Sequence, residues 1–323
     1  MNISQLRSWI LHRHWAADVV SWVIKYRNLQ HRYKENLPST STEGVVYMAD
    51  GSILHGGLSD RLRGMVSLYS YCSERGIKFY IHHTNPFNLV DYLIPNDYDW
   101  SLDEGNLSFD SAISKPLVVR PVSESCDRYF EERLAAHYNK LQLHVYSNVT
   151  YREDLFAKNF NTLFKPSRPL QNIIDRVLSQ IGDDYVSITF RFQQLLGDFK
   201  EGKYKTLDDA SKQHLINKCL LVIEQVYKSN NVATVLVTSD SKMFLEKAQQ
   251  TYEYVAIIPG EVKHIDYTDE KQNLAYIKSF ADLFVISKAK KVYFYSTSEM
   301  YGESTFAETG ALIGGTEYVQ IVE

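Results

Sequence analysis

Short apolar runs alternate with stretches of helical periodicity over most of the chain that follows Pro38. Continuous apolar runs predict buried strands, whereas apolar residues spaced three and four apart predict helices that pack on those strands. In the first half, strands are expected at residues 44–50, 78–83, 117–122 and 141–146, and helices at residues 58–75 and 128–140. This alternation is typical of a parallel sheet covered by helices.

The alternation restarts after a mainly helical stretch, residues 151–180, in which two prolines within Phe164–Leu170 indicate a domain junction. Beyond it, strands are expected at residues 185–192, 233–238, 254–259, 291–295 and 318–322, and helices at residues 206–228, 241–251, 270–287 and 304–313. The predicted fold class is therefore α/β. It consists of two Rossmann-like domains, residues 41–165 and 166–323, that face each other across a cleft.

Residues 1–40 are predicted to form an amphipathic helical extension at the N-terminus. Residues 1–35 hold six basic and two acidic side chains, a net charge of +4, and three of the four tryptophans, Trp9, Trp15 and Trp22. A basic, Trp-bearing helix can bind an anionic membrane surface. The alternative is that the extension packs on its own domain or on a second copy of the chain in a homodimer.

Composition narrows the class of protein. A chain of 323 residues with a formal net charge of -4 argues against a dedicated nucleic-acid binder. Cys72, Cys126 and Cys219 fit neither a zinc motif nor a disulfide framework, and no other residue spacing predicts a metal site. No apolar stretch is long enough to span a bilayer, and a secretory signal is not expected. We therefore expect a cytoplasmic protein, peripheral on the inner face of the membrane if its N-terminal extension binds lipid.

The loop His55–Gly64 is the first candidate for chemistry, because it follows an expected strand and begins a helix. Gly56 and Gly57 let the backbone approach a ligand, and a helix start favours anions. The first helical turns add three ionic side chains, those of Asp60, Arg61 and Arg63. The loop matches neither a phosphate-binding Walker loop nor a nicotinamide fingerprint, so an ordinary glycine turn is the alternative.

Three candidates follow expected strands of the second half. Arg191 ends an apolar strand, where its guanidinium can bind a phosphate or form a structural ion pair. Asp198 lies in the glycine-containing loop that follows, as a general base or as the cap of a turn. Asp240 comes directly after the next strand, where it can cap the following helix or contact a ligand.

Two further candidates lie on expected helices. Asp282 interrupts the apolar face of the helix at residues 270–287, where it can bind the ring N–H and amino group of a purine or remain solvated. Ser304 and Thr305 begin the helix at residues 304–313 and can cap it. The same hydroxyls and backbone amides can hold a diphosphate.

Taken in order, these motifs resemble those of the GT-B-fold fucosyltransferases, which include α1,2-, α1,6- and protein O-fucosyltransferases. The segment Gly56–Gly64 is similar to the first-strand loop of that superfamily. Thr189-Phe-Arg191 resembles its H-x-R motif, with Thr189 in place of the histidine, and Leu196-Gly-Asp198 resembles the x-G-D that follows.

Three later motifs complete the resemblance. Thr238-Ser-Asp240 is similar to the family's T-D-[SD] strand end, and Asp282 to the aspartate that binds guanine. Ser304-Thr-Phe306 resembles its S-[TS]-F at the phosphate-binding helix start. The resemblance thus implies that His55, the glycine loop and the later motifs bind substrates. The donor would bind mainly to the second domain, and the acceptor would enter from the first.

The resemblance implies transfer of L-fucose from GDP-L-fucose to a glycan hydroxyl, with inversion and without a metal or other cofactor. Arg191 would hold the diphosphate and Asp198 would be the base, with Asp60 and Glu201 as alternatives. The acceptor would be a glycan or lipid-linked saccharide of a bacterial polysaccharide pathway. The alternative functions are a GT-B transferase that uses another nucleotide sugar, or an inactive sugar- or nucleotide-binding relative, which Thr189 suggests.

Overall fold

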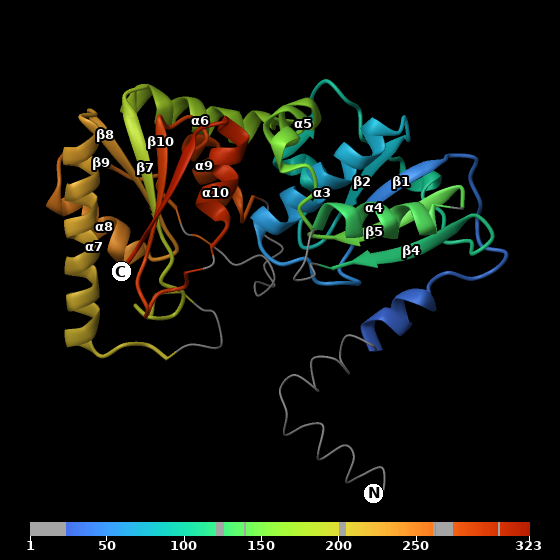
Figure 1. Cartoon of the computed structure of the whole chain (residues 1–323), viewed down its shortest axis with the longest axis horizontal. Helices are drawn as coiled ribbons and strands as arrows, with labels where there is room; N and C mark the ends of the chain where they lie inside the picture. Colours follow the sequence, from blue (N-terminus) through green and yellow to red (C-terminus); the bar gives the residue numbers. More distant parts are fainter. Residues whose placement is uncertain are drawn as a thin grey trace, which may run out of the picture.

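The computed structural model describes residues 24–120, 126–138, 140–199, 205–260, 262, 274–302 and 304–323. In these ranges the chain forms two α/β halves, each built on a parallel sheet, so the predicted fold class is confirmed (Figure 1). Of the N-terminal extension, the part that holds Trp9, Trp15 and Trp22 lies outside the described residues. No helix in the described part of the chain is long and apolar enough to cross a membrane.

The first sheet has the strand order β2-β1-β5-β4, and all neighbouring pairs are parallel. Its strands are β1 (Gly44–Ala49), β2 (Phe79–His83), β4 (Ser114–Val119) and β5 (Gln142–Ser147). Every residue of β1 is buried, with Val45 and Tyr47 on one face of the sheet and Val46 and Met48 on the other. Both faces of β1 are therefore covered, which explains its uninterrupted apolar sequence.

Helices cover the first face, and the described end of the N-terminal extension covers the second. The helices are α3 (Leu58–Glu74), α4 (Cys126–His137) and α5 (Phe156–Leu163), and the short 3-10 turns are η1 (Leu89–Asp91), η2 (Glu104–Asn106) and η3 (Glu153–Leu155). Residues 24–30 are helical, and Leu29 packs against Val46 and Met48. Next to it, Arg32 Nη1 lies 2.6 Å from Asp50 Oδ2, just after β1. Residues 24–33 are thus part of the first half.

The junction between the halves contains a small sheet that the sequence pattern did not predict. β3 (Leu93–Pro95) pairs antiparallel with β6 (Phe164–Pro166). Both strands have three residues and end in proline, so they lack the length and alternation that identify a strand. From β6 the chain enters α6 (Arg168–Ile181), which runs along the second half (Figure 1).

The second sheet has the order β11-β10-β7-β8-β9 and is also parallel throughout. Its strands are β7 (Tyr185–Phe190), β8 (Thr234–Ser239), β9 (Val255–Ala256), β10 (Lys291–Ser296) and β11 (Glu317–Val322). Its helices are α7 (Asp209–Asn230), α8 (Lys242–Thr251), α9 (Ile277–Ile286) and α10 (Phe306–Gly314). All five strands lie where the apolar runs predicted them.

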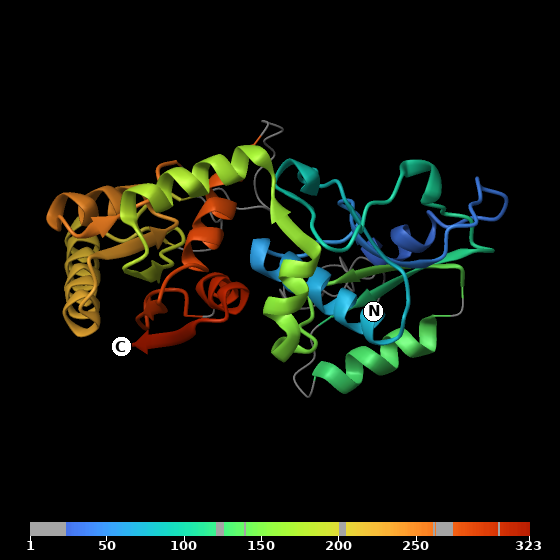
Figure 2. The same cartoon turned by 90° about the horizontal axis from the view of Figure 1, so that it is seen from above.

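The two halves share one apolar core. The ring of Phe280 on α9 stacks on that of Tyr92, with 4.5 Å between centroids, and Phe87 lies 5.1 Å from Tyr276. The backbone N–H of Tyr276 donates to Tyr92 Oη at 3.2 Å. In Figure 2 the beginning of α3 lies beside α10, so these helices of the two halves are neighbours.

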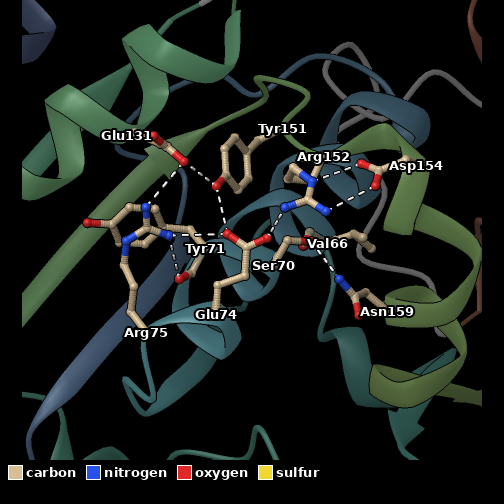
Figure 3. Close-up of polar contacts among 10 residues, drawn as sticks. All are labelled: Val66, Ser70, Tyr71, Glu74, Arg75, Glu131, Tyr151, Arg152, Asp154 and Asn159. Atoms are coloured by element: carbon tan, nitrogen blue, oxygen red, sulfur yellow. Dashed lines mark hydrogen bonds and ion pairs between the residues drawn. The ribbon is translucent and has the colours of Figure 1, made fainter.

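A network of ion pairs fixes the chain after β5 to the far end of α3 (Figure 3). Tyr151 Oη lies 2.8 Å from Glu74 Oε2 and 2.6 Å from Glu131 Oε1, on α3 and α4 respectively. Arg75 pairs with Glu131 at 3.2 Å, and Arg152 pairs with Glu74. The contacts with Tyr151 and Arg75 hold the pKa of Glu131 below its ordinary value. This network holds the β5–α5 connection in place.

Candidate functional site

Each sheet has a topological switch point, at which the connections from adjacent strands leave in opposite directions. In the first sheet β1 lies between β2 and β5, and in the second β7 lies between β8 and β10. Ligands of open parallel sheets bind beyond the carboxyl ends of the strands at such a point. The candidate residues lie in the loops after β1, β7, β8 and β10 or in the first turns of the helices that follow, except for Thr189 on β7 and Asp282 on α9. The topology and the motifs therefore indicate the same regions.

In the loop after β1, Asp60 caps its own helix. The N–H of Gly57 donates to Asp60 Oδ2 at 3.0 Å, which ties the start of α3 to its first turn. Gly56 has φ +82°, and a Cβ placed there would lie 2.3 Å from the same oxygen. Only glycine therefore suits this turn, and Asp60 has a structural role that accounts for its position.

Arg61 is buried in the first turn of α3, between backbone carbonyls and a neutral imidazole. Its Nε donates to the carbonyl of Gly56, and its Nη1 to that of Asn85, both at 3.2 Å. His83 Nε2 lies 3.5 Å from the same Nη1. Burial, and next the charge of Arg61, lower the pKa of His83 to about 3 and that of His55 to about 4. Both imidazoles are therefore neutral at pH 7, and Arg61 is held rigidly.

Arg63 reaches across to the second half. Its Nη2 lies 2.6 Å from Glu308 Oε2, and its Nε donates to Thr309 Oγ1 at 3.2 Å, both on α10. Arg63 therefore links the two halves of the chain. The sequence gives no signal for this partner, which lies 245 residues further along the chain.

Arg191 forms a buried ion pair just after β7. Its Nη1 lies 3.0 Å from Asp240 Oδ2, and its guanidinium stacks over the ring of Phe199 at 4.8 Å. Asp240 also accepts from the N–H groups of Phe192 at 2.9 Å and Gln193 at 2.7 Å. Burial raises the pKa of Asp240, whereas Arg191 and the amides act in the opposite direction. The Asp240 side chain is 1% exposed and that of Arg191 is 18% exposed, so only Arg191 is open to a ligand.

Asp198 lies beside this pair and caps the next helix. Its Oδ2 accepts from Ser241 Oγ and from the N–H of Met243, both at 2.9 Å. The residue is exposed, and it directly precedes the Phe199 on which Arg191 stacks. Thr189, in the place of the family's histidine, is buried, with its Oγ1 2.7 Å from Thr238 Oγ1. The loops after β7 and β8 are thus joined by side chains from both.

Asp282 has an internal partner on its own helix. Lys278 Nζ donates to both of its carboxylate oxygens, at 2.7 and 2.8 Å, and the two side chains are 4% and 2% exposed. Burial raises the pKa of Asp282, and Lys278 opposes this shift. Direct contact with a purine therefore requires that the base replace the ammonium group. The spacing of four residues between Lys278 and Asp282 was a signal for this pair in the sequence.

The start of α10 has the features of an anion site. Thr305 is the N-cap residue, but its side chain makes no capping hydrogen bond, and Ser304, Thr305 and Phe306 are partly exposed. The first N–H groups of a helix lack partners within it and attract negative charge. Thr305 lies at the expected helix start, although the capping by its hydroxyl is not observed.

The structure thus brings the candidates together in three groups. Arg191, Asp198 and Asp240 join the loops after β7 and β8, Arg63 joins α3 to α10, and Asp282 pairs within α9. Sequence reasoning missed Phe199, Lys278 and Glu308 as their partners. Glu201 lies outside the described residues. In the ranges that the structure covers, no group of three or more His, Cys, Asp or Glu residues is placed to hold a metal ion.

Neither a protein-family model nor a curated protein sequence matches this chain, but solved structures resemble its fold. A mutant of FUT1 from Arabidopsis thaliana, in complex with GDP, is 14% identical and has a TM-score of 0.53, covering 92% of this chain and 74% of that one. The α-1,6-fucosyltransferase NodZ, soaked with GDP-fucose, is 12% identical with a TM-score of 0.53, covering 84% and 92%. NodZ from Bradyrhizobium is 12% identical with a TM-score of 0.51, and the match covers 84% of this chain and 93% of that one. The chain therefore has the fold of these fucosyltransferases.

Proposed function

We propose that this protein is a glycosyltransferase that moves L-fucose from GDP-fucose to a hydroxyl group of a glycan. The observation that carries the proposal is the position of Arg191. Its guanidinium is held at the carboxyl end of β7, at the switch point of a sheet whose fold is shared with proteins solved with GDP or GDP-fucose. A planar guanidinium binds phosphate oxygens through paired hydrogen bonds.

In this proposal the donor binds mainly to the second half. The exposed part of Arg191 binds the diphosphate from the side of β7, and the first amides of α10 bind it from the side of β10. Asp240 does not touch the donor but keeps Arg191 in place. Asp282 contributes to recognition of the guanine through Lys278, since both of its own oxygens already accept from that ammonium.

Transfer proceeds by direct displacement. The acceptor hydroxyl enters from the first half, past the loop of Gly56 and Gly57, and attacks C1 of fucose opposite the diphosphate. The C1–O bond to the phosphate breaks through an oxocarbenium-like transition state, and GDP leaves with the electron pair. Asp198 takes the proton of the hydroxyl on Oδ1, while Ser241 and Met243 hold its Oδ2. The configuration at C1 is inverted.

Calorimetry with GDP tests donor binding. We expect binding to the wild-type protein with unchanged affinity in EDTA, because protein charges stabilise the diphosphate. Arg191→Ala is expected to weaken binding by about 10- to 100-fold, since hydrogen bonds to a charged group are worth about 1.5–3 kcal/mol. Lys242→Ala, which removes a cation of the same half from an exposed i,i+4 pair, is the control. Absence of binding at millimolar GDP would refute the proposal.

Two alternatives are outcomes of one further assay. If GDP-mannose or a UDP-sugar is consumed in place of GDP-fucose, the protein is a GT-B transferase with another donor. If no donor is consumed although GDP binds, it is an inactive nucleotide-binding relative. The hydrogen bond of Thr189 to Thr238, in the place of the family's histidine, favours this second alternative.

We further propose that the protein works at the inner face of the membrane on a lipid-linked or polysaccharide acceptor. The composition of the N-terminal extension supports membrane contact, because a net charge of +4 is combined with Trp9, Trp15 and Trp22, all three of which lie before residue 24. A chain that begins at residue 24 keeps Leu29 and Arg32, which pack on the first sheet. Loss of binding to anionic vesicles in that chain, with retained GDP binding, is the expected result. Unchanged vesicle binding would contradict it.

A further inference from the structure

The bridge from Arg63 to Glu308 and Thr309 joins two helix starts that the proposed reaction uses. Arg63 lies in the second turn of α3, directly after the glycine loop, and Glu308 lies in the first turn of α10. The Arg63 side chain is 11% exposed and that of Glu308 is 35% exposed. A pair shielded to this degree is screened less by water and salt than a surface pair.

Close packing fixes the bridge at both ends. A Cβ on Gly64, next to Arg63, would lie 2.1 Å from the carbonyl oxygen of Ser147 at the end of β5. A Cβ on Gly310, next to Thr309, would lie 2.4 Å from Ile286 Cγ2 on α9. Both helices therefore pack closely against their own halves at this point. Arg63 therefore joins two closely packed helices, whose starts lie side by side (Figure 2).

The negative charge of Glu308 opposes anion binding at the start of α10, and Arg63 neutralises this charge. A carboxylate in the first turn satisfies the helix dipole and repels a phosphate that binds to the same amides. Residues Thr305 and Glu308 have the spacing of a capping box, in which the carboxylate turns back to the N-cap amide. In the structure the Glu308 carboxylate instead contacts Arg63, and Thr305 makes no side-chain capping bond. The charge that would compete with a ligand is neutralised by the other half.

We propose that Arg63 is a positioning residue for donor binding. It neutralises Glu308 and keeps it away from the α10 amides, so that these amides can accept a diphosphate. The inference rests on the proposed function, because it assigns the diphosphate to α10. Through this bridge, the loop that receives the acceptor and the helix that binds the donor are parts of one unit.

Calorimetry with GDP and with inorganic pyrophosphate tests this charge relation. Arg63→Met keeps the length of the side chain, leaves Glu308 charged, and is expected to weaken both ligands about tenfold, which corresponds to about 1.4 kcal/mol. The double variant Arg63→Met/Glu308→Gln is expected to bind within about threefold of the wild type. Arg128→Met, in an exposed pair with Glu132 on α4, makes the same change in net charge and should leave binding unchanged.

Two results would overturn the inference while leaving the proposed function intact. One is a double variant that binds as weakly as Arg63→Met, because a purely structural bridge is not rescued by removal of the charge. The other is a failure of Glu308→Gln, which keeps Arg63, to bind pyrophosphate more tightly than the wild type. This variant tests the inference even if Arg63→Met does not fold. If the wild type binds neither ligand, both proposals fail. If the charge relation holds and no fucose is transferred, only the proposed function fails.

Discussion

Replacement of Asp240 by Asn is the sharpest test of how Arg191 is held. Asn keeps the shape of the side chain but loses its charge, and its amide nitrogen must face at least one of the N–H donors that bond to the carboxylate. These donors include the N–H groups of Phe192 and Gln193, at 2.9 and 2.7 Å, and Arg191 Nη1 at 3.0 Å. The substitution therefore breaks a buried ion pair and leaves one donor unpaired.

The magnitude follows from the burial of the pair. Removal of one member of a buried ion pair costs about 3–5 kcal/mol. An independent count gives a similar value, since a hydrogen bond to a charged group is worth about 1.5–3 kcal/mol and an unpaired buried donor costs about 1–3 kcal/mol. We expect Asp240→Asn to lower the free energy of unfolding in urea by this amount and to weaken GDP at least tenfold.

The assay is urea unfolding, followed by GDP calorimetry at a temperature at which the variant is folded. Asp184→Asn is the matched control, because Asp184 also pairs with a cation, Lys290 at 2.5 Å, and with a backbone amide, but at the surface. It should change neither stability nor binding appreciably. If Asp240→Asn unfolds at the wild-type urea concentration and binds GDP normally, Arg191 is not held by Asp240 and the reasoning is wrong.

Three other predictions concern the first half. Gly64→Ala places a Cβ 2.1 Å from the Ser147 carbonyl oxygen and is expected to lower the free energy of unfolding in urea by about 1–3 kcal/mol. Gly105→Ala, with no atom within 4 Å of its Cβ, should leave that free energy unchanged. Equal effects of the two substitutions would contradict this expectation. Because burial lowers the pKa of His83 to about 3, stability should fall as pH drops from about 6.5 toward 3, and His83→Asn should flatten that slope in urea midpoints measured against pH. Because the pKa of Glu131 is lowered, its contribution to stability is present above the ordinary pKa of Glu and is lost as the pH falls below that value. Glu131→Gln should remove this acid-sensitive part of the melting temperature. An unchanged dependence of the melting temperature on pH would refute the role of Glu131.

The sequence predicted most of the fold because the signals for strands are local. β1 is buried on both faces and its sequence is a continuous apolar run, so this strand could be predicted from residues 44–49 alone. The pair β3–β6 was missed because three-residue strands that end in proline carry no such signal. The order of strands in each sheet then places the loops after β1 and β7 at switch points, where the motifs had already indicated a site.

The partners of the candidate residues could not be predicted, because most of these contacts join residues that are far apart in the sequence and meet only in the folded chain. Asp198 follows a glycine, which is consistent with either a base or a cap, and only the position of α8 shows that it caps. Asp282 has its partner four residues away, which spacing could have revealed. Arg63 finds Glu308 on the other half, and no local rule connects the two.

Turnover of GDP-fucose tests the central claim most directly. The wild-type protein and Arg191→Ala are incubated with GDP-fucose, GDP-mannose and a UDP-sugar, with and without a panel of saccharide acceptors, and release of the nucleotide diphosphate is measured. We expect release of GDP from GDP-fucose in preference to the other donors, stimulation by a fucose acceptor, and loss of this activity in Arg191→Ala. Preference for another donor, or equal activity of the two proteins, would contradict it.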